Sequence, residues 1–125
     1  MERAVRVAAP EGELDISTID GVDLLLRDVP ADDHLVIDLG RVSFVDSVTL
    51  SRFVRAARRH RAAGSHVILA DARGAVRRVL SITQLDVVLP YADDVTAARR
   101  LAGSLEQGPA PDRPGPDSPP ASDLR

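Results

Sequence analysis

The sequence has no cysteine, no lysine and no tryptophan, and its only aromatic residues are Phe44, Phe53 and Tyr91. The absence of cysteine excludes disulfide bonds, thiol catalysis and thiolate zinc sites. All 16 basic residues are arginine, so Schiff-base chemistry, a P-loop lysine and a lysine general base are excluded as well. The shortage of aromatic rings removes the stacking surfaces that single-strand nucleic-acid binding usually needs.

Charge and hydropathy argue against two further kinds of partner. The formal net charge is −3 over 125 residues, which gives no basic surface for direct contact with nucleic acid or with an anionic membrane. No hydrophobic run approaches about 18 residues, and no basic segment followed by an apolar one opens the chain. We therefore expect a cytoplasmic protein with neither a membrane span nor a signal peptide.

The composition changes near Glu106. We expect a single domain over residues 1–105, which is enough chain for one modest core. Residues 106–125 are rich in proline and poor in apolar side chains, which predicts a disordered C-terminal tail. The alternative is a proline-rich ligand for an aromatic groove of another protein.

Strand and helix patterns alternate along the predicted domain. Strands are expected at residues 4–8, 34–39, 66–70 and 86–91, with a short strand-like stretch at 43–45. Helices are expected at residues 17–27, 47–63 and around 76–80, and after residue 93. We expect Ser17 and Asp93 to be N-caps and Gly64 to be a C-cap. The order predicts an α/β fold of about four strands with about four helices packed against them, in which at least some strand pairs are parallel.

The histidines and paired aspartates have structural explanations. His34, His60 and His66 show neither i, i+4 pairing nor acidic companions at ligand spacing, so we expect surface or edge positions and no metal site. The acidic pairs at residues 32–33 and 93–94 lie at helix ends, where turn and capping roles account for them.

The helix at residues 47–63 carries Arg52, Arg55 and Arg59 on one stripe, and no acidic residue of that helix can pair with them. Two interpretations stay open. The stripe is either a solvated outer face or a docking edge for an acidic partner surface, because guanidinium groups pair with carboxylates.

Asp46 and Ser47 lie where a strand passes into a helix, so one of them is expected to be the N-cap. A phosphate on Ser47 would meet free backbone N–H groups and the positive end of the helix dipole. It would add about −1.5 to −2 charges beside Asp46. A partner that buried this surface would have to desolvate that charge, so a phosphorylation switch and simple capping both remain open.

Several ordered segments resemble the STAS domains of bacterial anti-sigma factor antagonists. They are Gly12-Glu13-Leu14-Asp15, Val36-Ile37-Asp38-Leu39, Val42 to Ser47, Ala57-Arg58-Arg59, Gly64, Val67 to Ala70, Val76 to Leu80, and Leu85-Asp86. The resemblance spans about residues 4–103. It implies a small mixed sheet with helices packed against it, no catalytic machinery and no cofactor.

The resemblance also implies a partner and a switch. Members of the family bind an anti-sigma factor that is also a serine kinase, and a phosphatase reverses the modification. Carried onto this chain, Ser47 is the phosphoacceptor, Asp46 precedes it, and the turn formed by Gly12, Glu13 and Asp15 lies beside it. The oligomeric state stays open.

The sequence departs from the family at Val48 and Thr49, where a small hydroxyl residue and a glycine are usual. Two β-branched residues add bulk in the first turn of the helix and bear on partner docking. This departure favours an alternative, a STAS scaffold or accessory subunit of a lipid-transport complex that is not phosphorylated. A small α/β enzyme or nucleotide binder is a further alternative, although a glycine-rich loop and a convergent acid–base pair are lacking.

Overall fold

A computed structural model gives the fold of this chain over residues 3–107. Its elements in chain order are β1 (Val5–Ala8), β2 (Gly12–Leu14), α1 (Ile19–Arg27), β3 (His34–Asp38), β4 (Val42–Val45), α2 (Ser47–Ala62), β5 (Val67–Ala70), α3 (Gly74–Ile82), α4 (Leu85–Val88), β6 (Tyr91–Ala92) and α5 (Val95–Gln107). The predicted α/β class, with helices packed against a sheet, is confirmed.

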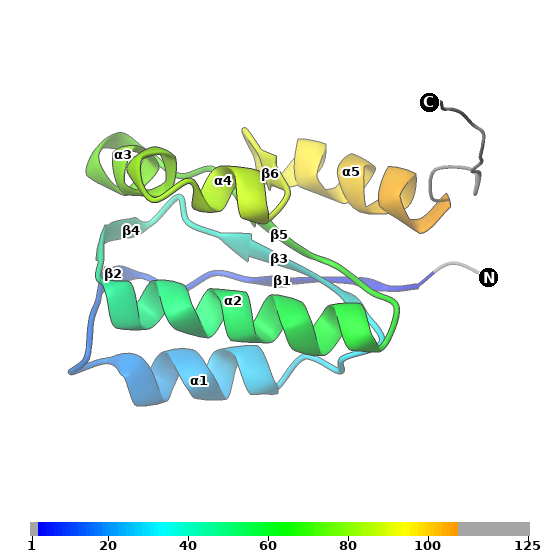
Figure 1. Cartoon of the computed structure of the whole chain (residues 1–125), viewed down its shortest axis with the longest axis horizontal. Coiled ribbons are helices and arrows are strands. Elements are labelled where there is room, and N and C mark those ends of the chain that lie inside the picture. Colours follow the sequence, from blue (N-terminus) through cyan, green and yellow to red (C-terminus); the bar gives the residue numbers. More distant parts are fainter. Residues whose placement is uncertain (1–2, 108–125) are drawn as a thin grey trace, which may run out of the picture.

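The strands form a four-stranded sheet in the order β1-β3-β5-β6 and a two-stranded sheet of β2 and β4. All pairings between the described strands are parallel, including those of the sheet that we expected to be mixed. β2 and β4 continue the chain segments of β1 and β3 beyond an interruption, at one end of the molecule (Figure 1). At the start of the β2–β4 pair, the Gly12 N–H donates to the Arg41 carbonyl at 2.9 Å.

Alternating side chains of the central strands give the sheet two buried faces. Leu35, Ile37 and Leu69 belong to the larger core, which α1, α2, α3 and α4 complete. Val36 and Ile68 belong to a smaller core that α5 completes. Figure 1 shows α1 and α2 together on one side of the sheet and α5 on the other. Strands buried on both faces explain the continuous aliphatic runs in the sequence.

The apolar stripe predicted for the long helix is confirmed in α2. Leu50, Phe53 and Ala57 are buried, and Val54 packs against the same core. Such an i, i+3, i+4, i+7 stripe turns one face of a helix toward the core. Beyond the helix end, Gly64 adopts φ +90° and its N–H donates to the Arg61 carbonyl at 3.0 Å, as expected of a C-terminal glycine.

The strand predicted at residues 86–91 is wrong. Residues 85–88 form the one-turn helix α4, and only Tyr91 and Ala92 form the strand β6. Val87 and Val88 are exposed, so their β-branched side chains do not mark a buried strand here. Gln84 separates α4 from α3 in a left-handed conformation with φ 60°, which the sequence pattern did not indicate.

Two N-caps and one boundary also differ from prediction. The N-cap position of α1 is Thr18 and not Ser17. At α5, Asp94 and not Asp93 provides the cap, since its Oδ1 accepts from the Ala97 N–H at 2.7 Å. α5 runs to Gln107, so the first two residues assigned to the tail are helical. The rest of the predicted tail, residues 108–125, lies outside the described residues.

Candidate functional site

Ser47 is the first residue of α2 and its side chain is exposed. The preceding Asp46 is the N-cap: its backbone is extended, and its Oδ1 accepts from the Thr49 N–H at 2.8 Å. The Ser47 hydroxyl makes no hydrogen bond within residues 3–107. The sequence could not decide which of the two residues is the cap, and the geometry assigns capping to Asp46 and leaves Ser47 free.

Asp46 also joins the start of α2 to the loop between β2 and α1. Its Oδ2 accepts from the Ile16 N–H at 3.0 Å, and its backbone N–H donates to the Leu14 carbonyl at 3.1 Å. The pKa of Asp46 lies below its usual value, chiefly because the Thr49 N–H donates to the ionised carboxylate. The charged form is therefore the one that holds this junction together.

The loop that Asp46 contacts is itself fixed by side-chain hydrogen bonds. Asp15 Oδ1 accepts from the Ser17 N–H at 2.9 Å and from the Ser17 hydroxyl, which explains why Ser17 is not the cap of α1. The Asp15 N–H donates to Thr18 Oγ1 at 3.0 Å, and that hydroxyl donates to the Glu13 carbonyl at 3.1 Å. The segment 12–15, which we expected to be a turn, is instead the strand β2 followed by Asp15, and its end is joined to Asp46 by the Leu14 carbonyl.

The strands β2 and β4 present exposed side chains beside this loop. Gly12 has φ +80° at a shift in the strand register, a conformation that glycine adopts without strain. Glu13 lies opposite Phe44 in the parallel register, and both are exposed. Phe44 is 46% exposed and Ile16 is 65% exposed, so both leave apolar surface open to solvent.

We call the exposed residues Glu13, Ile16, Phe44 and Ser47 the Ser47 surface. The sequence argument missed Ile16 and Phe44, because an apolar residue in a strand or turn is normally assigned to the core. No pattern in the sequence signals the exposure of Phe44, because burial along β4 does not alternate: Val42 and Val45 are buried, and Ser43 and Phe44 are exposed. Exposed apolar side chains on the segments that flank Asp46 and Ser47 are suited to contact with a protein partner.

Val48 and Thr49 face inward to different degrees. Val48 is half-buried and packs against the core. Thr49 has no exposed surface, and its buried Oγ1 has no hydrogen-bond partner among the described residues. Thr49, which we had placed among the partner-binding residues, is therefore a packing residue. Its hydroxyl is closed to a modifying enzyme while α2 is folded.

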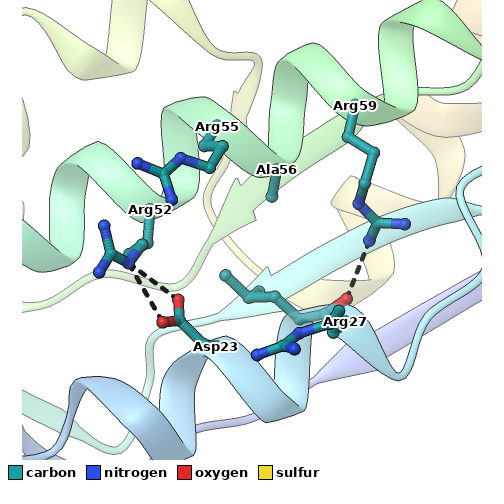
Figure 2. A pocket seen from close by; sticks show the side chains of 7 residues that line it. Asp23, Arg27, Arg52, Arg55, Ala56 and Arg59 are labelled. Carbon is teal, nitrogen blue, oxygen red and sulfur yellow. Dashed lines mark hydrogen bonds and ion pairs between the residues drawn. The ribbon is translucent and has the colours of Figure 1, made fainter.

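Arg52 and Arg55 do not belong to the Ser47 surface. Both line a groove between α1 and α2, where Arg52 Nε pairs with Asp23 Oδ1 at 2.9 Å (Figure 2). The absence of acidic partners within α2 is correct, but α1 supplies one across the helix pair. Arg55 is exposed.

His34 and His60 are buried, contrary to the surface or edge positions that we expected. His34 Nδ1 accepts from the His66 N–H at 3.1 Å, so its Nε2 donates to Glu106 at 3.0 Å. His60 Nδ1 lies 2.8 Å from the Asp33 carbonyl and donates to it. Their position at element ends suggested exposure, but loops and α5 cover them. Over the described residues, no three side chains of the metal-binding types are grouped to hold an ion.

The chain belongs to the STAS-domain family, since the family model for the STAS domain matches residues 3–98. Among solved structures, the fold is similar to the crystal structure of TM1081 from Thermotoga maritima, a candidate anti-sigma factor antagonist. The TM-score is 0.69 and the identity 23%, over 78% of this chain and 87% of that one. The NMR structure of TM1081 gives a TM-score of 0.65 at 22% identity, over 78% and 80% of the two chains.

A third similar structure is the STAS domain of a SulP transporter from Vibrio cholerae. Its TM-score is 0.62 and the identity 16%, over 85% of this chain and 87% of that one. At these sequence identities, the similarity to the three structures shows a shared fold and nothing more. A search of curated protein sequences gives no match. In the part of the chain that the structure describes, no helix is both long and apolar enough to cross a bilayer.

Proposed function

We propose that this STAS domain is a cytoplasmic anti-sigma factor antagonist. It binds an anti-sigma factor that is also a serine kinase, and phosphorylation of Ser47 releases that partner. A phosphatase resets the serine, so that the cycle controls sigma-dependent transcription. The observation that carries the proposal is the free, exposed Ser47 hydroxyl at the first position of α2, directly after the capping Asp46. The similarity in fold to TM1081 supports it.

The Ser47 surface explains how one phosphate could act as a switch. The unmodified surface offers the apolar side chains of Ile16 and Phe44 for burial by a partner. A phosphate on Ser47 adds about −1.5 to −2 charges next to the ionised Asp46. Water solvates that charge in the free protein, and the first N–H groups of α2 stabilise it. A partner that covered the surface would have to desolvate it, which costs several kcal/mol.

The test uses an anti-sigma factor kinase, ATP and mass spectrometry of the modified protein. Phosphate is expected on Ser47 alone, and Ser47→Ala is expected to abolish it. Ser51→Ala is the matched control, because Ser51 is an exposed serine one turn further along α2. Ser47→Asp is expected to weaken binding of the kinase by a factor of about 100, equivalent to about 2.7 kcal/mol. Phosphate on another residue would contradict the proposal.

A STAS module that is never phosphorylated is the second candidate. The half-buried Val48 and the fold similarity to the SulP transporter STAS domain favour it. Such a module would act as a scaffold or as an accessory subunit of a lipid-transport complex. For this candidate, Ser47→Asp leaves the partner affinity unchanged, whereas the phosphorylation switch requires a large loss.

A further inference from the structure

A second candidate surface lies between α1 and α2. It is a groove of about 260 Å³, and it shares no lining residue with the Ser47 surface. We call it the arginine groove. Its lining residues are Asp23, Leu26, Arg27, Arg52, Arg55, Ala56 and Arg59.

The four arginines of the groove differ in how their charge is compensated. Arg52 pairs with Asp23, at 2.9 Å between Nε and Oδ1. Arg59 Nη2 donates to the Leu26 and Val29 carbonyls at 3.1 and 3.2 Å, which are neutral acceptors. Figure 2 shows Arg52, Arg55 and Arg59 reaching into the groove from α2, across from Asp23 and Arg27 on α1.

Arg27 and Arg55 have no ion pair and no side-chain hydrogen bond with any residue in the range 3–107, and both are exposed. The groove is therefore lined by four guanidinium groups and one carboxylate, and that carboxylate pairs with Arg52. Arginine keeps its charge at any pH at which the protein is folded. The groove is thus locally positive in a chain whose net charge is −3. Its shape and charge call for an acidic ligand.

The layout of the groove distinguishes between kinds of acidic ligand. Arg52 and Arg59 are seven residues apart on one helix, which corresponds to about 10 Å along its axis. An extended peptide covers that distance in about three residues, at roughly 3.3 Å each. Leu26 and Ala56 form an apolar floor between the charges. The backbone N–H groups of this part of α2 are used within the helix, so none is left to cradle a compact anion.

We propose that the arginine groove binds an acidic segment of a protein partner. Carboxylates spaced along the segment pair with Arg27 and Arg55, and an aliphatic side chain between them packs on Leu26 and Ala56. The proposal goes beyond the Ser47 switch and holds whether or not Ser47 is modified. The arginine groove is then a second docking surface in addition to the Ser47 surface, and it lies on the side of the sheet that α1 and α2 cover.

The test is a titration of the full-length, 15N-labelled protein with an eight-residue peptide of alternating glutamate and leucine, followed by NMR. The first variant is Arg27→Gln with Arg55→Gln. The matched control is Arg58→Gln with Arg61→Gln, which removes the same charge from exposed positions of α2 outside the groove. Both variants are expected to fold, because none of these four side chains has a partner among the described residues. Circular dichroism checks this.

The peptide is expected to shift amide signals along the facing sides of α1 and α2. The groove variant should bind about tenfold more weakly, since each exposed ion pair contributes a few-fold to affinity, and the control less than twofold more weakly. Equal losses in both variants would show general attraction of charge and overturn the proposal. Inorganic phosphate that shifted the same signals with equal or higher affinity, at matched ionic strength, would also overturn it in favour of a small-anion site.

Discussion

Replacing Thr49 by valine tests how the first turn of α2 is packed beside Ser47. Thr49 has no exposed surface, and its hydroxyl is buried without a hydrogen-bond partner among the described residues. Such a hydroxyl costs about 1–3 kcal/mol of stability. Valine has nearly the same shape and a similar helix propensity. Thr49→Val is therefore expected to raise the free energy of unfolding by about 1–2 kcal/mol.

Urea unfolding followed by circular dichroism is the suitable assay, because the chain has no tryptophan. With a slope of about 2 kcal/mol per molar urea, the midpoint should rise by roughly 0.5–1 M. Thr83→Val is the matched control. Thr83 is exposed and its hydroxyl donates to the Val79 carbonyl at 2.7 Å, so the expected change is within about 0.5 kcal/mol of zero.

A loss of stability in Thr49→Val would refute this reasoning. The Asp46 carboxylate accepts from the Thr49 N–H, and the Thr49 hydroxyl also contributes to lowering the pKa of Asp46, so this carboxylate is an acceptor near the hydroxyl. A loss of about 1 kcal/mol would show that this hydrogen bond forms in solution. The Thr49 hydroxyl would then hold the Asp46 carboxylate in its capping position, so that Thr49 would orient Asp46 rather than only fill space in the core.

Phe53 has no exposed surface, so Phe53→Ala should lower the free energy of unfolding by about 3–5 kcal/mol in the same urea assay. Burial lowers the pKa of His60 and of His66 below 6.5, so the unfolded chain binds more protons than the folded one at acidic pH. The contribution of these two histidines to the free energy of unfolding should be fully present above about pH 6.5 and should be lost as the pH drops through their folded pKa values. The assay is the urea midpoint measured against pH, and a midpoint independent of pH would contradict this. Asp46→Asn keeps only one of the two carboxylate oxygens as an acceptor. Hydrogen exchange should therefore accelerate at the amide of Ile16 or at that of Thr49. Unchanged exchange at both donors would contradict that role.

The sequence predicted the parts of the fold where local pattern and tertiary structure agree. The stripe of Leu50, Phe53 and Ala57 has a helical period, and the helix lies with that stripe on the core. The aliphatic strands β3 and β5 are buried on both faces and could hardly be anything else. Where a segment is short, as at Val87 and Val88, β-branched residues favour a strand, but tertiary structure places them on an exposed helical turn.

For the candidate site, the sequence indicated the Asp46-Ser47 junction, but it missed Ile16 and Phe44 and did not indicate the contacts between segments. The position of Ser47 after Asp46 follows from the strand-to-helix pattern, whereas the hydrogen bond from Ile16 to Asp46 joins residues 30 positions apart. No local pattern encodes such a contact. The pairing of Arg52 with Asp23 was missed for the same reason, because the acidic partner lies on another helix. The burial of His34 depends on α5, which lies more than 60 residues further along the chain.

The two-stranded sheet of β2 and β4 has a consequence for how a partner acts on the protein. It pairs over only three residue positions, with a register shift at Gly12, and it carries the loop and the strand end that frame Ser47. Segments with so few paired residues open at a lower free-energy cost than the global unfolding of the domain. Local opening of this pair would disrupt the Ser47 surface, which we propose as the docking surface, while the four-stranded sheet stays intact. A partner that binds there has to keep β2 and β4 paired. The free-energy cost of preventing their opening therefore lowers the observed affinity.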